Sequence, residues 1–226
     1  MALLGNAIVC SWNDVKPEGR DDVYQWHNRE HLPERLGIPG FLRGRRLRSK
    51  SAVPELMFLY EARDMSVLGG QDYFARLDSP TPWTSQATKN FFNSYRSVFD
   101  VAYSAGVSMG GSMLALRVKP ADAERLRSTL IETILPSIES MIGVTGVHLA
   151  ISNPAISQRD TAEKRGRGAP FKMIGWVILI EANSDEVLKP IRAKLLTDDV
   201  LQSSGAEHAS VEGGIYQMEI CRLPQD

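Results

Sequence analysis

Cysteine and long apolar runs are both scarce in this sequence. It has two cysteines in 226 residues, Cys10 and Cys221, without the spacing of metal ligands or the density of a disulfide scaffold. No apolar run reaches the roughly 18 residues of a membrane span, and MALLGNAIVC lacks the basic start and small-residue cleavage site of a signal peptide. These absences predict a soluble, cytoplasmic protein with reduced thiols.

Surplus charge and the common nucleotide-binding motifs are absent as well. Lysine and arginine number 26 against 27 aspartates and glutamates, a formal net charge of −1, and like charges form no long run. Nucleic acid and anionic membranes select strongly basic faces, so we expect neither as a partner. No glycine cluster matches a dinucleotide-binding or phosphate-binding loop, and no serine lies in a G-x-S-x-G elbow.

The order of predicted elements repeats within the chain. Hydrophobic periodicity predicts, in the first half, strand 5–12, helix 17–36, strands 41–48 and 55–62, helix 83–99 and strand 100–109. Pro33 should break the first helix, so its main part is expected to end near His31. After Gly110-Gly111 it predicts strand 112–118, helix 121–142, strands 147–152 and 173–181, helix 185–196 and strand 214–222. We interpret residues 1–110 and 111–226 as two duplicated βαββαβ units.

Each unit would cover one face of its sheet with helices and leave the other face bare. Both bare faces must be buried, and the Gly110-Gly111 hinge is too short for a free linker. The sequence therefore predicts an α+β fold in which two tandem ferredoxin-like βαββαβ units pack as an intramolecular α+β barrel. Two separate sheets are the alternative. The polar stretch 153–171 would be a lid or a disordered loop.

The first helix carries titratable groups where a core-facing stripe is expected. At about 100° per residue one stripe contains Val23, His27, Glu30 and Glu34, with Trp26 and His31 on its flanks. Buried ionisable groups cost several kcal/mol unless they are paired or solvated. The helix should therefore line a polar pocket.

The second unit provides a control for the first. When the Leu-Pro pairs 32–33 and 135–136 are superposed, His27 and His31 fall on Leu130 and Ile134. With three extra residues in the second copy, Arg43 and Arg45 would fall opposite Leu149 and Ile151. Polar groups that displace apolar counterparts favour a functional site, because stability alone is usually better served by apolar residues.

We predict a pocket with separate catalytic and binding groups. Its catalytic residues would be His27, His31 and Glu30, because an imidazole titrates near neutral pH. Its substrate-binding residues would be Arg43, Arg45, Trp26 and Glu34, with the arginines holding an anionic group. A buried ion-pair network between the glutamates and the arginines is the alternative.

Residues 27–31 also spell H-x-x-E-H, a zinc-binding pattern in which two histidines bind the metal and the glutamate acts as base. Pro33 shortens the helix, and no second helix offers an obvious third ligand. We therefore expect no metal and no other cofactor.

The same residues resemble the EthD-like branch of the dimeric α+β barrel superfamily. Its first helix carries an aromatic residue and spaced histidines, followed by a proline and a Pro-Gly turn, which here are Trp26, His27, His31, Pro33 and Pro39-Gly40. The resemblance implies a cavity between sheet and helices, where relatives perform cofactor-free isomerisation, cyclisation, dehydration or oxygenation of aromatic or lactone-like compounds. Haem-binding members of the superfamily use a histidine ligand that has no residue-by-residue match here.

These observations predict a cofactor-independent lyase or isomerase of catabolism or biosynthesis. It would act on a compact anionic aromatic or lactone-like compound by histidine-based proton transfer. A cofactor-free monooxygenase and a non-catalytic ligand-binding or stress-associated barrel are the alternatives. The expected partner is a small anionic substrate, and a homodimer is compatible with the fold.

Overall fold

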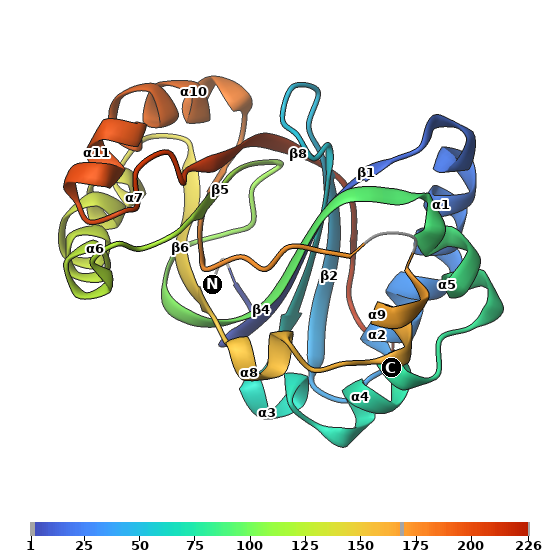
Figure 1. Ribbon diagram of the computed structural model, residues 1–226. Helices are drawn as coiled ribbons and strands as arrows, with labels where there is room; N and C mark the ends of the chain where they lie inside the picture. The colour runs from blue at the N-terminus through green and yellow to red at the C-terminus, as the bar shows by residue number, and fades with distance from the viewer. Residues whose placement is uncertain (1–2, 168–169, 226) are drawn as a thin grey trace.

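Eight strands close into one antiparallel barrel in the computed structural model, which describes residues 3–167 and 170–225 (Figure 1). The strands are β1 (Ala7–Val15), β2 (Phe41–Arg48), β3 (Leu56–Ala62), β4 (Phe91–Gly106), β5 (Ser112–Val118), β6 (Val144–Ser152), β7 (Trp176–Ala182) and β8 (Glu212–Arg222). Around the barrel they follow the order β1-β3-β2-β8-β5-β7-β6-β4.

The two halves of the chain contribute equivalent sheets to this barrel. The first half has the ferredoxin-like order β4-β1-β3-β2, and the second half has β8-β5-β7-β6. Two seams, β2 with β8 and β4 with β6, join the sheets edge to edge. The predicted fold class is thus confirmed, and no strand of the described residues is left at an open edge of the barrel.

Helices cover the outside of the barrel on two opposite sides (Figure 1). The first half contributes the turn η1 (Pro17–Gly19), α1 (Arg20–Trp26), the π-helical turn η2 (His27–His31), α2 (Leu32–Leu36), α3 (Met65–Leu68), α4 (Gln71–Asp78), α5 (Pro82–Ala87) and the turn η3 (Thr88–Asn90). The second half contributes α6 (Ala123–Thr129), the π-helical turn η4 (Leu130–Ile134), α7 (Leu135–Glu139), α8 (Pro154–Ser157), α9 (Ala162–Gly166), α10 (Asp185–Lys194) and α11 (Asp198–Ser203). No helix among the described residues has the length and apolar character needed to cross a membrane.

The first helix continues past Pro33, so the predicted end near His31 is wrong. The turn η2 is followed directly by α2, in whose first turn Pro33 lies, where a missing N–H is tolerated. The second half repeats this arrangement, with the π-helical turn η4 before Pro136. Because the helix runs on to Leu36, Arg35 is placed one helical turn beyond His31.

Residues 91–99 form the start of β4, so the predicted helix 83–99 is wrong beyond its first turns. The helix α5 ends at Ala87, and the turn η3 leads directly into the strand. Phe91 is buried and Phe92 is exposed, and Val98 and Phe99 belong to different cores on the two faces of the sheet. The segment therefore has the period of two that is typical of a strand.

Three apolar cores fill the molecule. One lies inside the barrel and includes Trp12, Phe99 and Tyr216. The other two lie outside, each between one half's sheet and its helices. In the second half the outer core is apolar throughout, whereas in the first half it is interrupted by buried imidazoles and guanidinium groups.

Residues 168 and 169 of the predicted loop 153–171 lie outside the described residues, and the rest of the stretch packs against the first half instead of forming a free loop. It leaves β6, places α8 against β4, and places α9 against α4 and α5 of the first half (Figure 1). Side chains from the second half thereby reach the helices that carry the two imidazoles.

Candidate functional site

A small cavity lies between the outer face of the first half's sheet and its helices. We call it the helix–sheet cavity, and its volume is about 30 Å³. Aromatic rings of Trp26, Phe58, Tyr60 and Phe91 line it. A space of this size holds a water molecule or two but not an aromatic compound. In this structure the cavity therefore has no room for such a compound.

His31 presents an unbonded imidazole to this cavity. It is 8% exposed, its ring lies 4.3 Å from that of Trp26, and its Nδ1 has no hydrogen-bond partner among the described residues. Burial, and then the positive charge of Arg35, hold its pKa well below the ordinary 6.5. The imidazole is therefore neutral at neutral pH and free to accept a proton.

His27 is buried behind the cavity and orients Tyr60. Its Nδ1 lies 3.4 Å from Nη1 of Arg46 and its Nε2 lies 3.1 Å from the hydroxyl of Tyr60. A guanidinium can only donate, so Nδ1 accepts and Nε2–H donates to the Tyr60 oxygen. Burial raises the pKa of Tyr60, which keeps the phenol protonated. The hydroxyl hydrogen of Tyr60 is consequently left for another acceptor.

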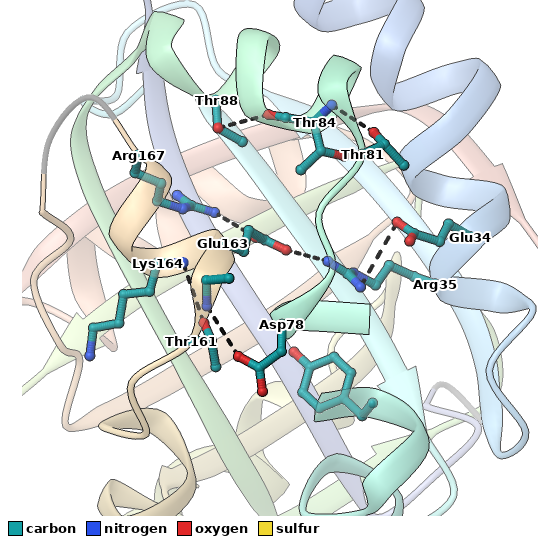
Figure 2. Close-up of polar contacts among 12 residues, drawn as sticks. Glu34, Arg35, Asp78, Thr81, Thr84, Thr88, Thr161, Glu163, Lys164 and Arg167 are labelled. Carbon is teal, nitrogen blue, oxygen red and sulfur yellow. Dashed lines mark hydrogen bonds and ion pairs between the residues drawn. The ribbon is translucent and has the colours of Figure 1, made fainter. Parts of the chain in front are cut away.

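Three arginines and one glutamate complete the polar lining. Arg35 of α2 forms an ion pair with Glu163 of α9, whose other oxygen lies 3.4 Å from Nη2 of Arg167 (Figure 2). Arg96 of β4 donates to the hydroxyl of Tyr73. Burial alone would raise the pKa of Glu163, but Arg35, Arg167 and Arg96 together hold it below 4.5.

The guanidinium groups retain unused hydrogen-bond donors. Nη1 of Arg35 and Nη1 of Arg167 are buried and have no hydrogen-bond partner among the described residues. Arg96 also lines the cavity, so its lining has three guanidinium groups and one carboxylate, that of Glu163. A second carboxylate, that of Glu34, lies 4.0 Å from Nη1 of Arg35. Buried donors without acceptors are costly, and a charge-assisted hydrogen bond to an anion would satisfy them. The cavity is thus suited to an anionic group.

Trp26, Glu30 and Glu34 occupy different places relative to this cavity. Trp26 lines it, and its indole N–H donates to Thr84 at 3.0 Å. Glu30 instead accepts hydrogen bonds from the hydroxyls of Thr81 and Thr84, at 2.5 and 3.2 Å, and so ties the helix to α5. Glu34 lies beside Arg35 with 4.0 Å between the charged atoms.

Arg43 and Arg45 lie on the other face of the sheet, inside the barrel. Arg43 binds Glu61 at 2.7 and 2.9 Å, and Arg45 binds Glu181 at 2.8 and 3.1 Å. A bulge between Phe41 and Arg43 shifts the register, so that Phe41 faces the helices while both arginines face inward. The structure therefore does not bring these arginines together with the imidazoles, and their ion-pair partners are not Glu30 and Glu34.

The same bulge corrects the alignment of the two halves. Gly40 and Gly143, each with positive φ, directly precede β2 and β6, and each strand has a register shift two residues later. The three extra residues predicted for the second copy are therefore absent. Arg45 corresponds to His148 rather than to Ile151, since both lie opposite an inward-facing leucine of the neighbouring strand.

The residues that the sequence analysis missed come mostly from distant segments. Arg35 lies four positions after His31. A helix predicted to continue past Pro33 would have placed the two side chains on the same face. Arg96 lay in the segment predicted to be helical. Glu163 is 128 residues from its partner Arg35, and nothing local marks either it or Arg167.

Two side chains of the H-x-x-E-H pattern, His27 and Glu30, make hydrogen bonds elsewhere in the structure. In the part of the chain that the structure describes, no three His, Cys, Asp or Glu side chains gather in a group that could hold a metal ion. Glu30 of the H-x-x-E-H pattern bonds to threonines of α5.

The buried histidines predict a pH-dependent stability. Both pKa values lie well below 6.5, so below that pH the unfolded chain binds protons that the folded chain does not. The free energy of unfolding should therefore fall as pH is lowered from 6.5 toward 4.5, and carboxylates such as Glu163 should add to the loss only below 4.5. Urea denaturation at several pH values would measure this, with His27→Leu/His31→Ile as the comparison. An equal slope in both proteins between pH 6.5 and 4.5 would contradict the assignment.

No protein-family model matches the sequence, and no curated protein matches it. Three solved structures resemble the fold over nearly the whole chain. An anthrone oxidase-like protein has a TM-score of 0.63 and 9% identity, with 97% of this chain and 93% of that chain covered.

The other two come from bacteria. A candidate monooxygenase from Fusobacterium nucleatum subsp. nucleatum has a TM-score of 0.58 and 13% identity, with 98% and 96% covered. A candidate monooxygenase from Lactobacillus acidophilus has a TM-score of 0.56 and 11% identity, with 97% of each chain covered. At these identities the likeness shows the fold alone, a ferredoxin-like α+β barrel.

Proposed function

We propose that this chain is a cofactor-independent enzyme, a lyase or isomerase, that moves a proton in a compact anionic aromatic or lactone-like substrate. The observation that carries the proposal is the set of buried, unpartnered nitrogens of His31, Arg35 and Arg167 around one cavity. Arg35, Arg96 and Arg167 bind the carboxylate or phenolate, taking the place predicted for Arg43 and Arg45. His31 accepts the proton.

Substrate binding tunes the base in this scheme. In the empty site burial, and then the positive charge of Arg35, keep the pKa of His31 low, which makes its imidazole a weak base. A bound anion offsets that positive charge, so the imidazole becomes more basic when substrate is present. The proton leaves a C–H bond for His31 and returns at another carbon in an isomerisation, or a leaving group departs in an elimination.

Tyr60 stabilises the charge that develops. Its hydroxyl hydrogen is not used by His27, which donates to it, and the ring lines the helix–sheet cavity. A hydrogen bond from this phenol to an enolate oxygen strengthens as negative charge accumulates there. His27 acts as a positioning residue that holds Tyr60 through its Nε2–H.

Access to the site requires movement of α9. The cavity of about 30 Å³ excludes the substrate while Glu163 lies between Arg35 and Arg167. The substrate anion replaces the carboxylate of Glu163 on these guanidinium groups, and α9 moves outward with it. The helix α9, within the segment predicted to be a lid or a disordered loop, thus serves as a lid.

A cofactor-free monooxygenase is the second candidate. Two solved structures of the same fold are named as candidate monooxygenases and a third as anthrone oxidase-like. The same base would produce a carbanion that reacts with O₂, so that a CH₂ becomes a carbonyl and the second oxygen atom leaves as water. In both schemes we assign the chain to the EthD-like branch and, from its two unbridged cysteines, to the cytoplasm.

Deuterium exchange into phenylpyruvate, an aromatic carboxylate with an acidic CH₂, tests the proposal. In D₂O the wild-type protein is expected to accelerate loss of the methylene NMR signal without oxygen uptake. Stoichiometric O₂ consumption at an oxygen electrode would identify the monooxygenase instead. Binding with neither exchange nor oxygen uptake would identify a ligand-binding barrel.

The Arg35→Met variant separates binding from chemistry. Arg35 contacts the anion in both ground and transition states, so KM should rise at least about tenfold. The loss of its positive charge beside His31 should raise the pKa of the imidazole, so kcat should not fall. An unchanged KM would contradict the assignment of Arg35 to the substrate anion. The matched control is Arg125→Met, on the exposed first turn of α6, which should leave both constants unchanged.

A further inference from the structure

A second hollow lies at one end of the barrel, separate from the helix–sheet cavity. We call it the barrel-mouth hollow, and its volume is about 380 Å³. Its walls come from β4, β5, the segment 172–175 before β7 and the residues 209–212 that lead into β8. None of its lining residues lines the helix–sheet cavity. Its volume falls in the range of small-molecule sites.

Positive charge dominates this hollow. Its lining includes Arg117, Lys119 and Lys172 against the single carboxylate of Glu212, a surplus of two positive charges. Nη2 of Arg117 lies 3.2 Å from Glu212, but Nε and Nη1 have no hydrogen-bond partner among the described residues. No carboxylate of those residues lies within 4.0 Å of either lysine. The hollow thus offers cationic groups whose charge is not offset.

Arg117 is held rigidly by aromatic rings. It is 4% exposed, and its guanidinium carbon lies 4.1 Å from the ring centre of Tyr95 and 5.4 Å from that of Trp12. Stacking of this kind fixes the guanidinium plane, so little entropy is lost when it binds an anion. The ammonium of Lys172 lies 5.4 Å from the Tyr95 ring. Buried Ile174 adds an apolar wall.

The two halves contribute different side chains to this mouth. Trp12 and Arg117 occupy equivalent positions in the two halves. The pairing of β1 with β3 begins at Ala7, and the matching pairing of β5 with β7 begins at Ser112. Trp12 and Arg117 each lie five residues after these starts. Tyr95, opposite Trp12, corresponds to Glu212, opposite Arg117. A buried arginine where the other half has tryptophan costs stability, and such exchanges are retained mainly for function.

We propose that the barrel-mouth hollow binds a small aromatic carboxylate. The carboxylate lies among Arg117, Lys119 and Lys172, and the ring lies against Tyr95 and the apolar wall. A flat apolar body matches the aromatic and aliphatic lining, and one negative charge matches the surplus of positive charge. The site is independent of the helix–sheet cavity and of the reaction proposed for it.

Titration of 4-fluorobenzoate followed by ¹⁹F NMR tests this site. The protein used is Arg35→Met, in which anion binding at the helix–sheet cavity is weakened. Adding Arg117→Met should lower the affinity at least tenfold, and adding Lys172→Gln should lower it about threefold to tenfold. Lys172 is exposed and its backbone bonds to Ser94 and Arg96 persist, so this variant folds even where Arg117→Met does not.

The controls separate the carboxylate from the ring and from bulk charge. Lys89→Gln, at an exposed position away from the hollow, should leave the affinity unchanged. Cyclohexanecarboxylate and inorganic phosphate should both bind at least threefold more weakly than 4-fluorobenzoate. Equal affinity for the three anions would overturn the aromatic specificity. The site itself would be overturned if 4-fluorobenzoate bound the Arg35→Met protein as tightly after Arg117→Met or Lys172→Gln was added as before.

Discussion

His31→Ile is expected to lower kcat by roughly 10²- to 10⁴-fold, the usual contribution of a general base, while leaving the protein at least as stable. Ile134 occupies the equivalent place in the second half and packs in its apolar core. Nδ1 of His31 has no partner among the described residues, so its removal strands no donor or acceptor there. Deuterium exchange into phenylpyruvate gives kcat, and urea denaturation gives the free energy of unfolding.

The matched control for His31→Ile is His27→Leu. His27 bonds to both Tyr60 and Arg46, so its loss strands the buried Tyr60 hydroxyl and should cost about 1–3 kcal/mol. Adding Tyr60→Phe should recover much of that loss by removing the stranded group. If His31→Ile lost as much stability as His27→Leu and kept its turnover, the imidazole of His31 would be structural rather than catalytic.

Glu181→Ala is expected to give the largest loss of stability, about 3–5 kcal/mol, because it leaves a buried charge without its partner. Glu181 is fully buried inside the barrel, binds Arg45 at 2.8 and 3.1 Å, and accepts from the Gly110 N–H at 2.9 Å. Burial alone would raise its pKa, but Arg45, with a further contribution from His148, brings it to about 2. Equilibrium unfolding in urea at pH 7 measures the effect.

Two further variants show whether charge is the cause. Glu124→Ala, on the exposed first turn of α6, should change the free energy of unfolding by less than about 0.5 kcal/mol. Glu181→Gln keeps an acceptor for the Gly110 N–H but removes the charge. Its free energy of unfolding should therefore lie between those of Glu181→Ala and Glu124→Ala. A loss below about 1 kcal/mol in Glu181→Ala would mean that Glu61, 3.0 Å from Arg45, can neutralise that arginine by itself.

Much of the fold could be predicted because its signals are local or repeated. The strands β2 and β5 begin and end at the predicted residues, 41–48 and 112–118, since each is bounded by polar or glycine-containing segments. The duplication then predicted the barrel, because two bare sheet faces must be buried against each other. Comparison of the two halves likewise indicated that His27 and His31 replace apolar residues.

The predicted helix 83–99 extended too far because its local sequence does not distinguish a helix from a strand. Residues 83–99 contain aromatic and small polar residues that fit either period, and only pairing of β4 with both β1 and β6 selects the strand. Arg96 was missed for that reason. It reaches the cavity from a strand rather than from a helix face.

The sequence by itself determined the order of elements, the barrel and the position of the imidazoles, because periodicity and internal repetition are properties of the chain. Only the tertiary structure decided which charges share the cavity. A single bulge after Phe41 turns Arg43 and Arg45 into the barrel, since side chains alternate faces at every residue and a shift of one reverses them. Glu163 and Arg167 reach the same cavity from the other half, a contact set by how the chain crosses the barrel and not by any local pattern.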